Sequence, residues 1–368
     1  MKVAVLTSSR ADYGIAFPLL KALNSDSFFD LHVIAFGTHL SVKHGETVNR
    51  IIRDGFNVSI KVDSMPTGDA PDTIAVAMGK TMISFSKIWN ENQFDIIIAL
   101  GDRYEMFAAC ASSIPFNIPI AHIHGGETTL GAFDDAFRHS ITQMSTWHFT
   151  TTEKYKQRVT ELKGSDKNVY NVGALSIDNL HSLQLLTIEE FKAKFNINLS
   201  IPSILITFHP ETVNFEKNRV YVDNLIAALK EIRNYQFIIT MPNADTTGNM
   251  IREQLAKFIS ENRNAIGVES FGTLGYLSCM KYCSMMLGNT SSGFVEAAFF
   301  PKYVINIGER QLGRILTENI YNCKIEKEEI ISAVKNFEHM QLDNKINLFG
   351  DGTAASKIVL ELKTMQSY

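Results

Sequence analysis

Short runs of apolar residues alternate with helical patterns along the whole chain. In the first half these runs lie at 3–7, 31–36, 96–100, 118–123, 148–151 and 169–172. In the second half they lie at 204–208, 236–240, 284–287 and 303–307. Continuous apolar runs of this length are typical of parallel strands that are covered on both faces, and their alternation with helices predicts an α/β fold.

The strand and helix pattern restarts near residue 200. A chain of 368 residues is also too long for one ordinary core. We therefore predict two Rossmann-like domains that face each other across a cleft, as in nucleotide-sugar glycosyltransferases of the GT-B type. Residues 1–180 form the domain with the acid and base groups, residues 181–352 form the nucleotide-binding domain, and residues 353–368 form a last helix that we expect to pack back on the first domain.

Composition and charge narrow the class of protein. The net charge is −4 and 45% of the residues are hydrophobic, so no electrostatic field favours nucleic acid or an anionic membrane as a partner. The four cysteines lack the paired spacing of a disulfide framework or a structural metal site. The apolar run at the amino terminus has only four residues, too few for a signal peptide. We expect a cytoplasmic protein without a metal.

Acidic and imidazole side chains concentrate in one stretch of the first half. Asp102 directly follows one apolar run, and His124 and Glu127 follow the next. Because open parallel sheets bind ligands outside the carboxyl ends of their strands, we expect these groups to share a crevice with Asp134 of the following helix. His122 and His124 alternate along a strand and should face opposite sides, so one of them is expected to pack structurally.

Phosphate-binding features differ between the two halves. The turn after the first strand lacks GxGxxG, so we expect no nicotinamide or flavin cofactor. In the second half an apolar run ends in GNTSSG at 288–293, and the pattern predicts a helix at 294–300. Small residues, hydroxyl groups and a helix amino terminus together favour a phosphate ligand. Glu296 fits either the dipole of that helix or a hydrogen bond to a ribose diol.

Eight short strings, taken in order, resemble the UDP-N-acetylglucosamine 2-epimerase family, and most closely its hydrolysing bacterial branch in sialic-acid biosynthesis. They are SSRADYG (8–14), GDRYE (101–105), HIHGGE (122–127), DDAFRHSIT (134–142), HPE (209–211), PNAD (242–245), GNTSSG (288–293) and GERQLGR (308–314). Their order and spacing are more specific than any single string. The resemblance implies conversion of UDP-N-acetylglucosamine and water to N-acetylmannosamine and UDP without a cofactor, by a homodimer or homotetramer.

The same resemblance assigns site residues. Asp102 and Asp134 match catalytic carboxylates, and His209 matches a catalytic histidine that contacts phosphate. The positions that match the UDP-binding site are Arg10, Arg103, His209, Asn243, Thr290, Ser291, Ser292, Glu296 and Arg310. Many relatives have HIEGGE, in which the first glutamate is catalytic, whereas this chain has His124 there. Either His124 or Glu127 is then expected to take the role of that glutamate.

Four other functions stay open at this point. The same reaction on a UDP-2,4-diacetamido-2,4,6-trideoxyhexose differs only in pocket contacts at carbons four and six. A GT-B glycosyltransferase requires an acceptor, and a non-hydrolysing epimerase releases UDP-N-acetylmannosamine. A regulator that binds the nucleotide sugar without turnover is favoured by the histidine at position 124.

Overall fold

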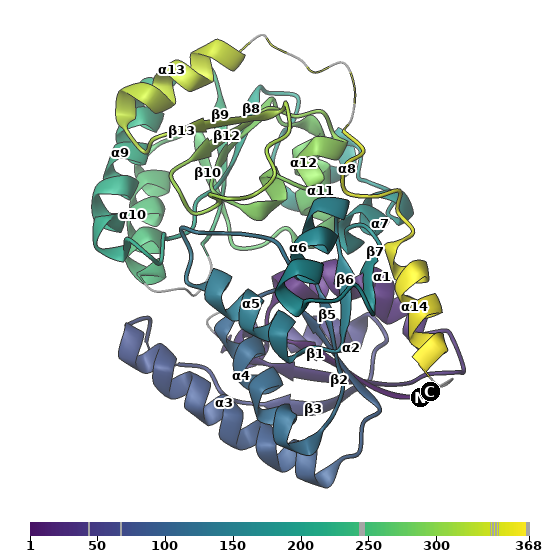
Figure 1. Cartoon of the computed structure of the whole chain (residues 1–368). Coiled ribbons are helices and arrows are strands. Elements are labelled where there is room, and N and C mark those ends of the chain that lie inside the picture. The colour runs from purple at the N-terminus through teal and green to yellow at the C-terminus, as the bar shows by residue number, and fades with distance from the viewer. Residues whose placement is uncertain are drawn as a thin grey trace. The chain divides into compact units, whose positions relative to one another are not determined.

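The chain forms two compact units (Figure 1). The structure is a computed structural model that describes residues 1–42, 45–66, 68–242, 247–338, 340, 342, 344 and 346–365. Unit 1 contains Met1–Glu127, Asp134–Ser182 and Leu348–Tyr368, and unit 2 contains Thr128–Phe133 and Leu183–Asn347. A division at residue 180 would place Thr128–Phe133 in the first domain. The segment instead packs within unit 2, where the Leu130 amide donates to the Leu312 carbonyl at 2.9 Å.

Unit 1 is built around a seven-stranded sheet in the order β3-β2-β1-β4-β5-β6-β7, with parallel pairing throughout. Its strands are β1 (Lys2–Thr7), β2 (Asp30–Phe36), β3 (Val58–Val62), β4 (Ile96–Leu100), β5 (Ile120–Ile123), β6 (Trp147–Thr150) and β7 (Val169–Asn171). Its helices are α1 (Arg10–Asn24), α2 (Val48–Arg53), α3 (Pro71–Glu91), α4 (Tyr104–Ser113), α5 (Asp134–Met144), α6 (Glu153–Lys163), α7 (Leu175–Ser182) and α14 (Ala354–Thr364), with 3₁₀ turns η1 (Gly37–Leu40) and η3 (Ile114–Phe116).

Helices cover both faces of the sheet of unit 1. Successive residues of β1 point to opposite faces, so Val3 packs in a cluster with α1, α7 and α14, whereas Ala4 packs in a cluster with α3 and α4. Asp178 of α7 holds the last helix in place, because its carboxylate accepts from the amides of Ala354 (3.0 Å) and Ala355 (2.7 Å). The central strands are therefore buried on both faces, which explains their continuous apolar sequences.

Unit 2 repeats this plan around a six-stranded parallel sheet in the order β10-β9-β8-β11-β12-β13. Its strands are β8 (Ser203–Thr207), β9 (Gln236–Thr240), β10 (Ala265–Val268), β11 (Met285–Gly288), β12 (Val304–Ile307) and β13 (Ile320–Cys323). Its helices are α8 (Ile188–Phe195), α9 (Asn218–Glu231), α10 (Gly248–Glu261), α11 (Gly272–Tyr282), α12 (Glu296–Phe299) and α13 (Lys327–Phe337), with 3₁₀ turns η4 (Phe215–Lys217) and η5 (Ser291–Gly293).

Each sheet reverses its strand order at one point. The reversal lies between β1 and β4 in unit 1 and between β8 and β11 in unit 2. Open α/β sheets bind their ligands outside the carboxyl ends of the strands at such a switch point. In unit 1 these ends lead into residues 8–14 and 101–105, and in unit 2 into residues 208–211 and 288–293. The motifs of the sequence therefore follow the strands where this fold binds ligands.

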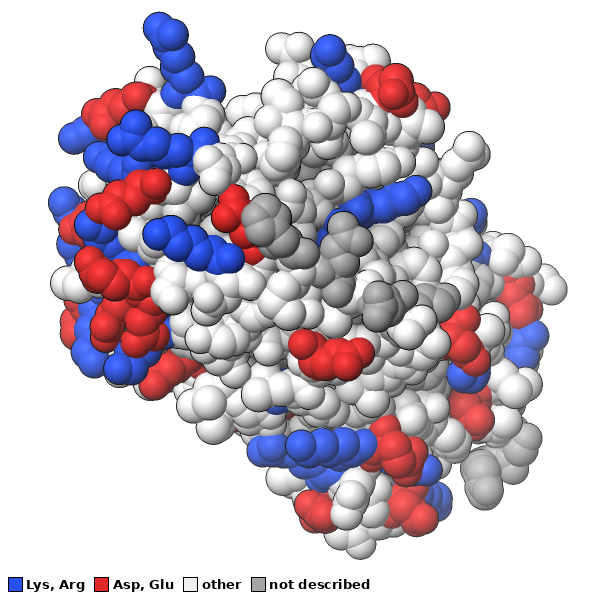
Figure 2. Space-filling model, turned by 90° about the horizontal axis from the view of Figure 1, so that it is seen from above, with Lys and Arg blue, Asp and Glu red and all other residues white. Residues whose placement is uncertain are grey.

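The surface carries charges of both signs. On the face drawn in Figure 2, the described acidic and basic side chains lie interspersed among uncharged ones. This mixture agrees with the small net charge of −4. Among the described residues, no helix combines the length and the hydropathy that a membrane span requires.

Candidate active site

The turn after β1 is fixed by Asp12, in the first turn of α1. The Asp12 carboxylate accepts from the amides of Ser8 (2.9 Å) and Ser9 (3.0 Å) and from the hydroxyl of Thr7. Burial alone would raise the pKa of Asp12, but the hydrogen bonds and the nearby His39 outweigh it and lower this pKa. The same turn sets the position of Arg10, the first residue of α1.

A buried guanidinium organises the carboxyl ends of β4 and β5. Arg138 of α5 is only 3% exposed, and its Nη2 forms an ion pair with Asp102. Its Nη1 donates to the backbone carbonyl of His124 at 2.8 Å and lies 3.8 Å from Glu127 Oε2. Arg138 thus joins three of the predicted catalytic residues in one cluster. Charge-assisted contacts of this kind fix the geometry of a carboxylate more firmly than neutral hydrogen bonds.

His124 and Glu127 form a second pair within this cluster. His124 Nδ1 lies 3.6 Å from Glu127 Oε1, and the hydroxyl of Thr151 donates to the same oxygen at 3.2 Å. His124 has a φ of 66°, a left-handed conformation that few residues other than glycine adopt. Strained backbone of this kind clusters at functional sites. Gly126 also has a positive φ, of 79°, and a Cβ there would lie 2.5 Å from the Tyr155 carbonyl.

His122 is the structural one of the two neighbouring histidines, as expected for side chains on opposite sides of a strand. It is fully buried on β5, and its Nε2 donates to the Gly101 carbonyl at 2.8 Å. The Thr142 hydroxyl donates to its Nδ1, at 3.0 Å. Burial lowers the pKa of His122 to about 3, so the ring is neutral at physiological pH. Through these hydrogen bonds, His122 connects the turn before Asp102 to β5 and α5.

The remaining predicted residues of unit 1 lie near the same strand ends. Asp134 is the first residue of α5, one turn before Arg138, and it is buried. Arg103 follows β4 and makes a bidentate pair with Glu105, with Nε and Nη2 each 3.1 Å from a carboxylate oxygen. Because Glu105 is fully buried, it holds the Arg103 guanidinium in one orientation.

In unit 2, Asn289 connects the ends of β8 and β11. Its Oδ1 accepts from the amide of His209 at 2.7 Å, and its Nδ2 donates to the carbonyl of His209 at 2.8 Å. Gln311 in turn donates to the Asn289 carbonyl at 2.8 Å. Arg310 Nε donates to the Pro210 carbonyl at 3.2 Å. The segments that carry His209, Asn289 and Arg310 are therefore connected to one another in unit 2, with Asn289 at the centre of these contacts.

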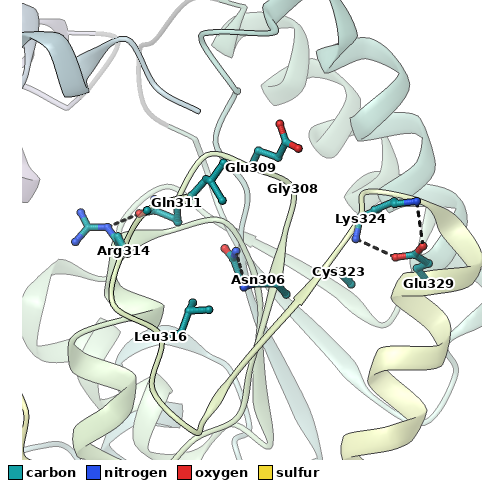
Figure 3. Close-up of a pocket in the computed structure, with 12 residues that line it drawn as sticks. Asn306, Gly308, Glu309, Gln311, Arg314, Leu316, Cys323, Lys324 and Glu329 are labelled. Carbon is teal, nitrogen blue, oxygen red and sulfur yellow. Dashed lines mark hydrogen bonds and ion pairs between the residues drawn. The ribbon is translucent and has the colours of Figure 1, made fainter. Parts of the chain in front are cut away.

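A pocket of about 420 Å³ lies beside the 308–314 loop (Figure 3). Arg314 donates to Gln311 at its rim at 2.6 Å, and Lys324 lies against Glu329 on the other side. Glu309 also lines this pocket, but the described lining includes no predicted UDP-binding residue.

The GNTSSG loop presents hydroxyl groups, but its helix is shorter than predicted. The Tyr276 hydroxyl lies 2.7 Å from Ser292 Oγ, which lies 3.2 Å from Thr290 Oγ1. Instead of a helix at 294–300, the chain makes a 3₁₀ turn and then the four-residue α12, which begins at Glu296. The helix begins two residues later than predicted and ends at Phe299, and Pro301 disfavours helical backbone at the residue in between. A helix this short has little dipole, so this loop offers an anion mainly hydroxyls and amides.

The structure thus groups the predicted residues in two sets. Unit 1 holds Arg10, Asp102, Arg103, His124, Glu127 and Asp134, and unit 2 holds His209, Thr290, Ser291, Ser292, Glu296 and Arg310. Asn243 lies outside the described residues. Sequence reasoning did not assign a role to Arg138 or Asn289. The sequence does place Arg138 on the same helix face as Asp134, through their spacing of four residues, but this spacing alone does not show that Arg138 contacts Asp102.

Comparisons with known proteins identify the family of the chain. Residues 21–363 match the family model described as UDP-N-acetylglucosamine 2-epimerase. The polysialic acid biosynthesis protein P7 of Escherichia coli is 34% identical over 334 residues, which cover 90% of this chain and 85% of that protein. The GDP/UDP-N,N'-diacetylbacillosamine 2-epimerase (hydrolyzing) of Campylobacter jejuni is 33% identical over 325 residues, which cover 88% of this chain and 84% of that protein.

A solved structure shares the fold. The UDP-GlcNAc 2-epimerase from Neisseria meningitidis, bound to UDP-GlcNAc, matches with a TM-score of 0.82 at 18% identity over 99% of this chain and 100% of that one. The prediction of two Rossmann-like α/β units of the GT-B type is confirmed. The chain belongs to the UDP-N-acetylglucosamine 2-epimerase family, and it is an enzyme of the hydrolysing UDP-sugar 2-epimerase kind.

Proposed function

We propose that the enzyme converts UDP-N-acetylglucosamine and water to N-acetylmannosamine and UDP, in the cytoplasm and in support of sialic-acid synthesis. The observation that carries the proposal is the buried cluster in which Arg138 joins Asp102, His124 and Glu127. Such a concentration of proton-transfer groups at the carboxyl ends of two strands suits a reaction with two separate proton transfers.

The reaction needs these groups because the hydrogen at carbon two of the sugar is not acidic. Departure of UDP develops positive charge at the anomeric carbon, which acidifies that hydrogen. A base takes the proton, the C1–O bond breaks with its electron pair going to the β-phosphate oxygen, and a C1=C2 double bond forms. Water then adds to C1, and C2 receives a proton from the opposite face. The site must therefore supply a base, an acid and a group that orients water.

We assign Asp102 as a principal proton-transfer group, held in one orientation by Arg138. Asp134, one turn before Arg138 on α5, is assigned as the second carboxylate. The pair of His124 and Glu127 takes the role of the glutamate that many relatives carry at position 124. An imidazole can give or accept a proton near neutral pH, and the carboxylate 3.6 Å from its Nδ1 orients the ring.

We assign recognition of UDP to a second set of groups. In unit 2 these are the hydroxyls of the GNTSSG loop together with His209, Glu296 and Arg310. In unit 1 they are Arg10 and Arg103, which follow the neighbouring strands β1 and β4. Positive groups and amides are needed here because negative charge on the leaving diphosphate grows as the C1–O bond breaks. Removing one preorganised donor of this kind commonly costs about 3 kcal/mol of transition-state stabilisation.

The substrate is tested by comparing kcat/KM for UDP-N-acetylglucosamine and for a UDP-2,4-diacetamido-2,4,6-trideoxyhexose. The second sugar is a candidate because the Campylobacter jejuni relative is named for a diacetamido sugar. We expect the higher kcat/KM with UDP-N-acetylglucosamine. A strong preference for the diacetamido sugar would show that this sugar, and not UDP-N-acetylglucosamine, is the substrate of the same reaction. An absolute need for a sugar acceptor would overturn the proposal in favour of a glycosyltransferase.

A further inference from the structure

The turn at 308–310 in unit 2 is held by the buried carboxylate of Glu211. Glu211 follows His209 by two positions, in the segment after β8, and it is only 1% exposed. Its Oε1 accepts from the amide of Glu309 at 2.6 Å, although the two residues lie 98 positions apart in the chain. The residue after Glu309 is Arg310, which we assign to UDP. The contact therefore lies next to a group that the proposed function needs.

The backbone of Glu211 is itself fixed by a buried asparagine. Asn218, the first residue of α9, accepts from the Glu211 amide at 3.0 Å and donates to the Glu211 carbonyl at 2.9 Å. Asn289 makes the same pair of contacts with the backbone of His209. Two asparagines thus hold the segment 209–211 from both ends. A side chain that starts from so well-fixed a backbone can in turn fix the group that it contacts.

The turn carries no side chain at the place where this carboxylate lies. Gly308 has a φ of 80°, and a Cβ there would lie 2.2 Å from Glu211 Oε1. The positive φ favours glycine, and the close approach of the carboxylate requires it. A Cβ at Gly131 would lie 2.3 Å from the carbonyl oxygen of Glu309, so the segment 128–133 packs on the same residue within unit 2. The backbone of Glu309 is therefore held at its amide and packed against at its carbonyl.

The second carboxylate oxygen of Glu211 is buried and has no hydrogen-bond partner among the described residues. Burial raises the pKa of Glu211, and the amides of Glu309 and Arg310, which favour the charged form, offset this effect only in part. A buried carboxyl oxygen without a partner costs free energy of folding. The stability of unit 2 therefore does not account for a glutamate at this position. Polar groups kept at such a cost are typical of functional sites.

We propose that Glu211 is a positioning residue for UDP recognition, which fixes the turn at 308–310 and through it the guanidinium of Arg310. This inference rests on the assignment of Arg310 to the diphosphate in the proposed function. Arg310 Nε donates to the Pro210 carbonyl at 3.2 Å, so the guanidinium contacts the same segment that carries Glu211. With its backbone and its Nε both held, Arg310 keeps one orientation. A donor of fixed orientation loses less freedom when the diphosphate binds.

The first test measures the dissociation constant of UDP for the full-length chain by isothermal titration calorimetry. Glu211→Leu removes the acceptor for the Glu309 amide and should raise this constant about tenfold, because Arg310 is then less well placed. Glu211→Gln keeps a carbonyl oxygen for that amide and should stay within about threefold of the wild type. A tenfold loss in Glu211→Gln as well, or no loss in Glu211→Leu, would overturn the proposal.

The matched control is a second buried carboxylate that holds backbone amides. Asp178 is 6% exposed and accepts from the amides of Ala354 and Ala355 in unit 1. Burial raises its pKa as well. Asp178→Leu should lower Tm at least as much as Glu211→Leu and leave the UDP constant unchanged. An equal loss of UDP affinity in the two variants would show that destabilisation alone weakens UDP binding, and the proposal would fail.

The last test is a double-mutant cycle with Arg310→Met. If Glu211 acts through Arg310, Glu211→Leu should weaken UDP binding less than about twofold in the Arg310→Met background, because no guanidinium remains to be positioned. If Glu211 contacts UDP directly or serves only the fold, the full loss recurs in that background and overturns the proposal.

The same cycle separates this inference from the proposed function. Because the readout is binding of UDP, the result does not depend on which UDP-sugar the enzyme converts. Arg310→Met that binds UDP as tightly as the wild type would refute the assignment of Arg310 and, with it, the positioning role of Glu211. Weak binding by Arg310→Met together with wild-type binding by Glu211→Leu would keep the assignment of Arg310 and refute the role of Glu211 alone.

Discussion

Arg138→Met tests whether one buried guanidinium organises the acid and base groups. Methionine keeps much of the volume of arginine but removes the charge. The substitution leaves Glu127, 3% exposed, and Asp102 without the cation that contacts them. It also removes the donor to the His124 carbonyl, 2.8 Å away. Loss of one partner of a buried ion pair costs about 3–5 kcal/mol of folding free energy.

The effect on catalysis follows from the same contacts. A misplacement of about 1 Å at a reacting group can cost roughly a hundredfold in rate, and Asp102 loses the group that fixes its position. We expect kcat to fall about a hundredfold. Arg138→Lys should recover only part of the loss, because one ammonium group cannot reach all three acceptors with the geometry of a planar guanidinium.

The assay combines urea unfolding with initial rates of UDP release. The matched control is Arg158→Met on α6, where Nη2 donates to His139 Nε2 at 3.3 Å and the side chain is partly exposed. This control should change the free energy of unfolding by less than about 1 kcal/mol and leave kcat unchanged. A kcat of Arg138→Met within twofold of the wild type would refute the organising role of Arg138.

Three further predictions concern single positions. His124→Asn removes the imidazole but introduces a residue that also tolerates a positive φ. We expect kcat to fall at least about tenfold with little change in Tm. An unchanged kcat would exclude His124 from proton transfer. In Gly101→Ala the new Cβ meets no atom, but alanine must adopt a φ of 85°, which costs about 1 kcal/mol. In Gly126→Ala the new Cβ also collides with the Tyr155 carbonyl. Urea unfolding should therefore show a larger loss of unfolding free energy for Gly126→Ala than for Gly101→Ala. Burial lowers the pKa of His122 to about 3 and that of His148 to about 4. Below pH 6.5 the unfolded chain therefore binds more protons than the folded chain. The free energy of unfolding should fall as the pH falls toward 4, by up to about 1.4 kcal/mol per pH unit for each ring. His148→Leu should make this dependence shallower, and an identical slope would show that His148 is not held neutral.

Burial explains which strands the sequence predicts. The central strands, such as β1, β4, β8 and β11, lie in the middle of their sheets and read as continuous apolar runs. The strands missed by sequence reasoning are β3, β10 and β13, and each lies at the edge of its sheet. β3 alternates partly buried and exposed residues along most of its length. Three of the four edge strands therefore lack the continuous apolar pattern that identifies a strand covered on both faces, whereas the fourth, β7, was predicted from the run at 169–172.

The residues of the candidate active site also differ in how far the sequence alone predicts their positions. Asp102, His124 and His209 follow predicted strands, so topology alone places them at the carboxyl ends of the sheets. Arg138 reaches the cluster only because α5 packs beside β5 and α4, which depends on tertiary contacts. The positive φ of His124 was not predicted either, because histidine adopts this conformation more often than most residues but still uncommonly. Patterns along the chain thus locate strand ends, whereas the contacts of a helix with its neighbours require the folded structure.

The central claim is elimination of UDP followed by hydration, with proton exchange at carbon two. The most direct measurement is proton NMR of the enzyme with UDP-N-acetylglucosamine in deuterated water. The account predicts UDP and free N-acetylmannosamine that carries deuterium at carbon two. Release of UDP-N-acetylmannosamine, or of N-acetylmannosamine that keeps its original proton at carbon two, would contradict it.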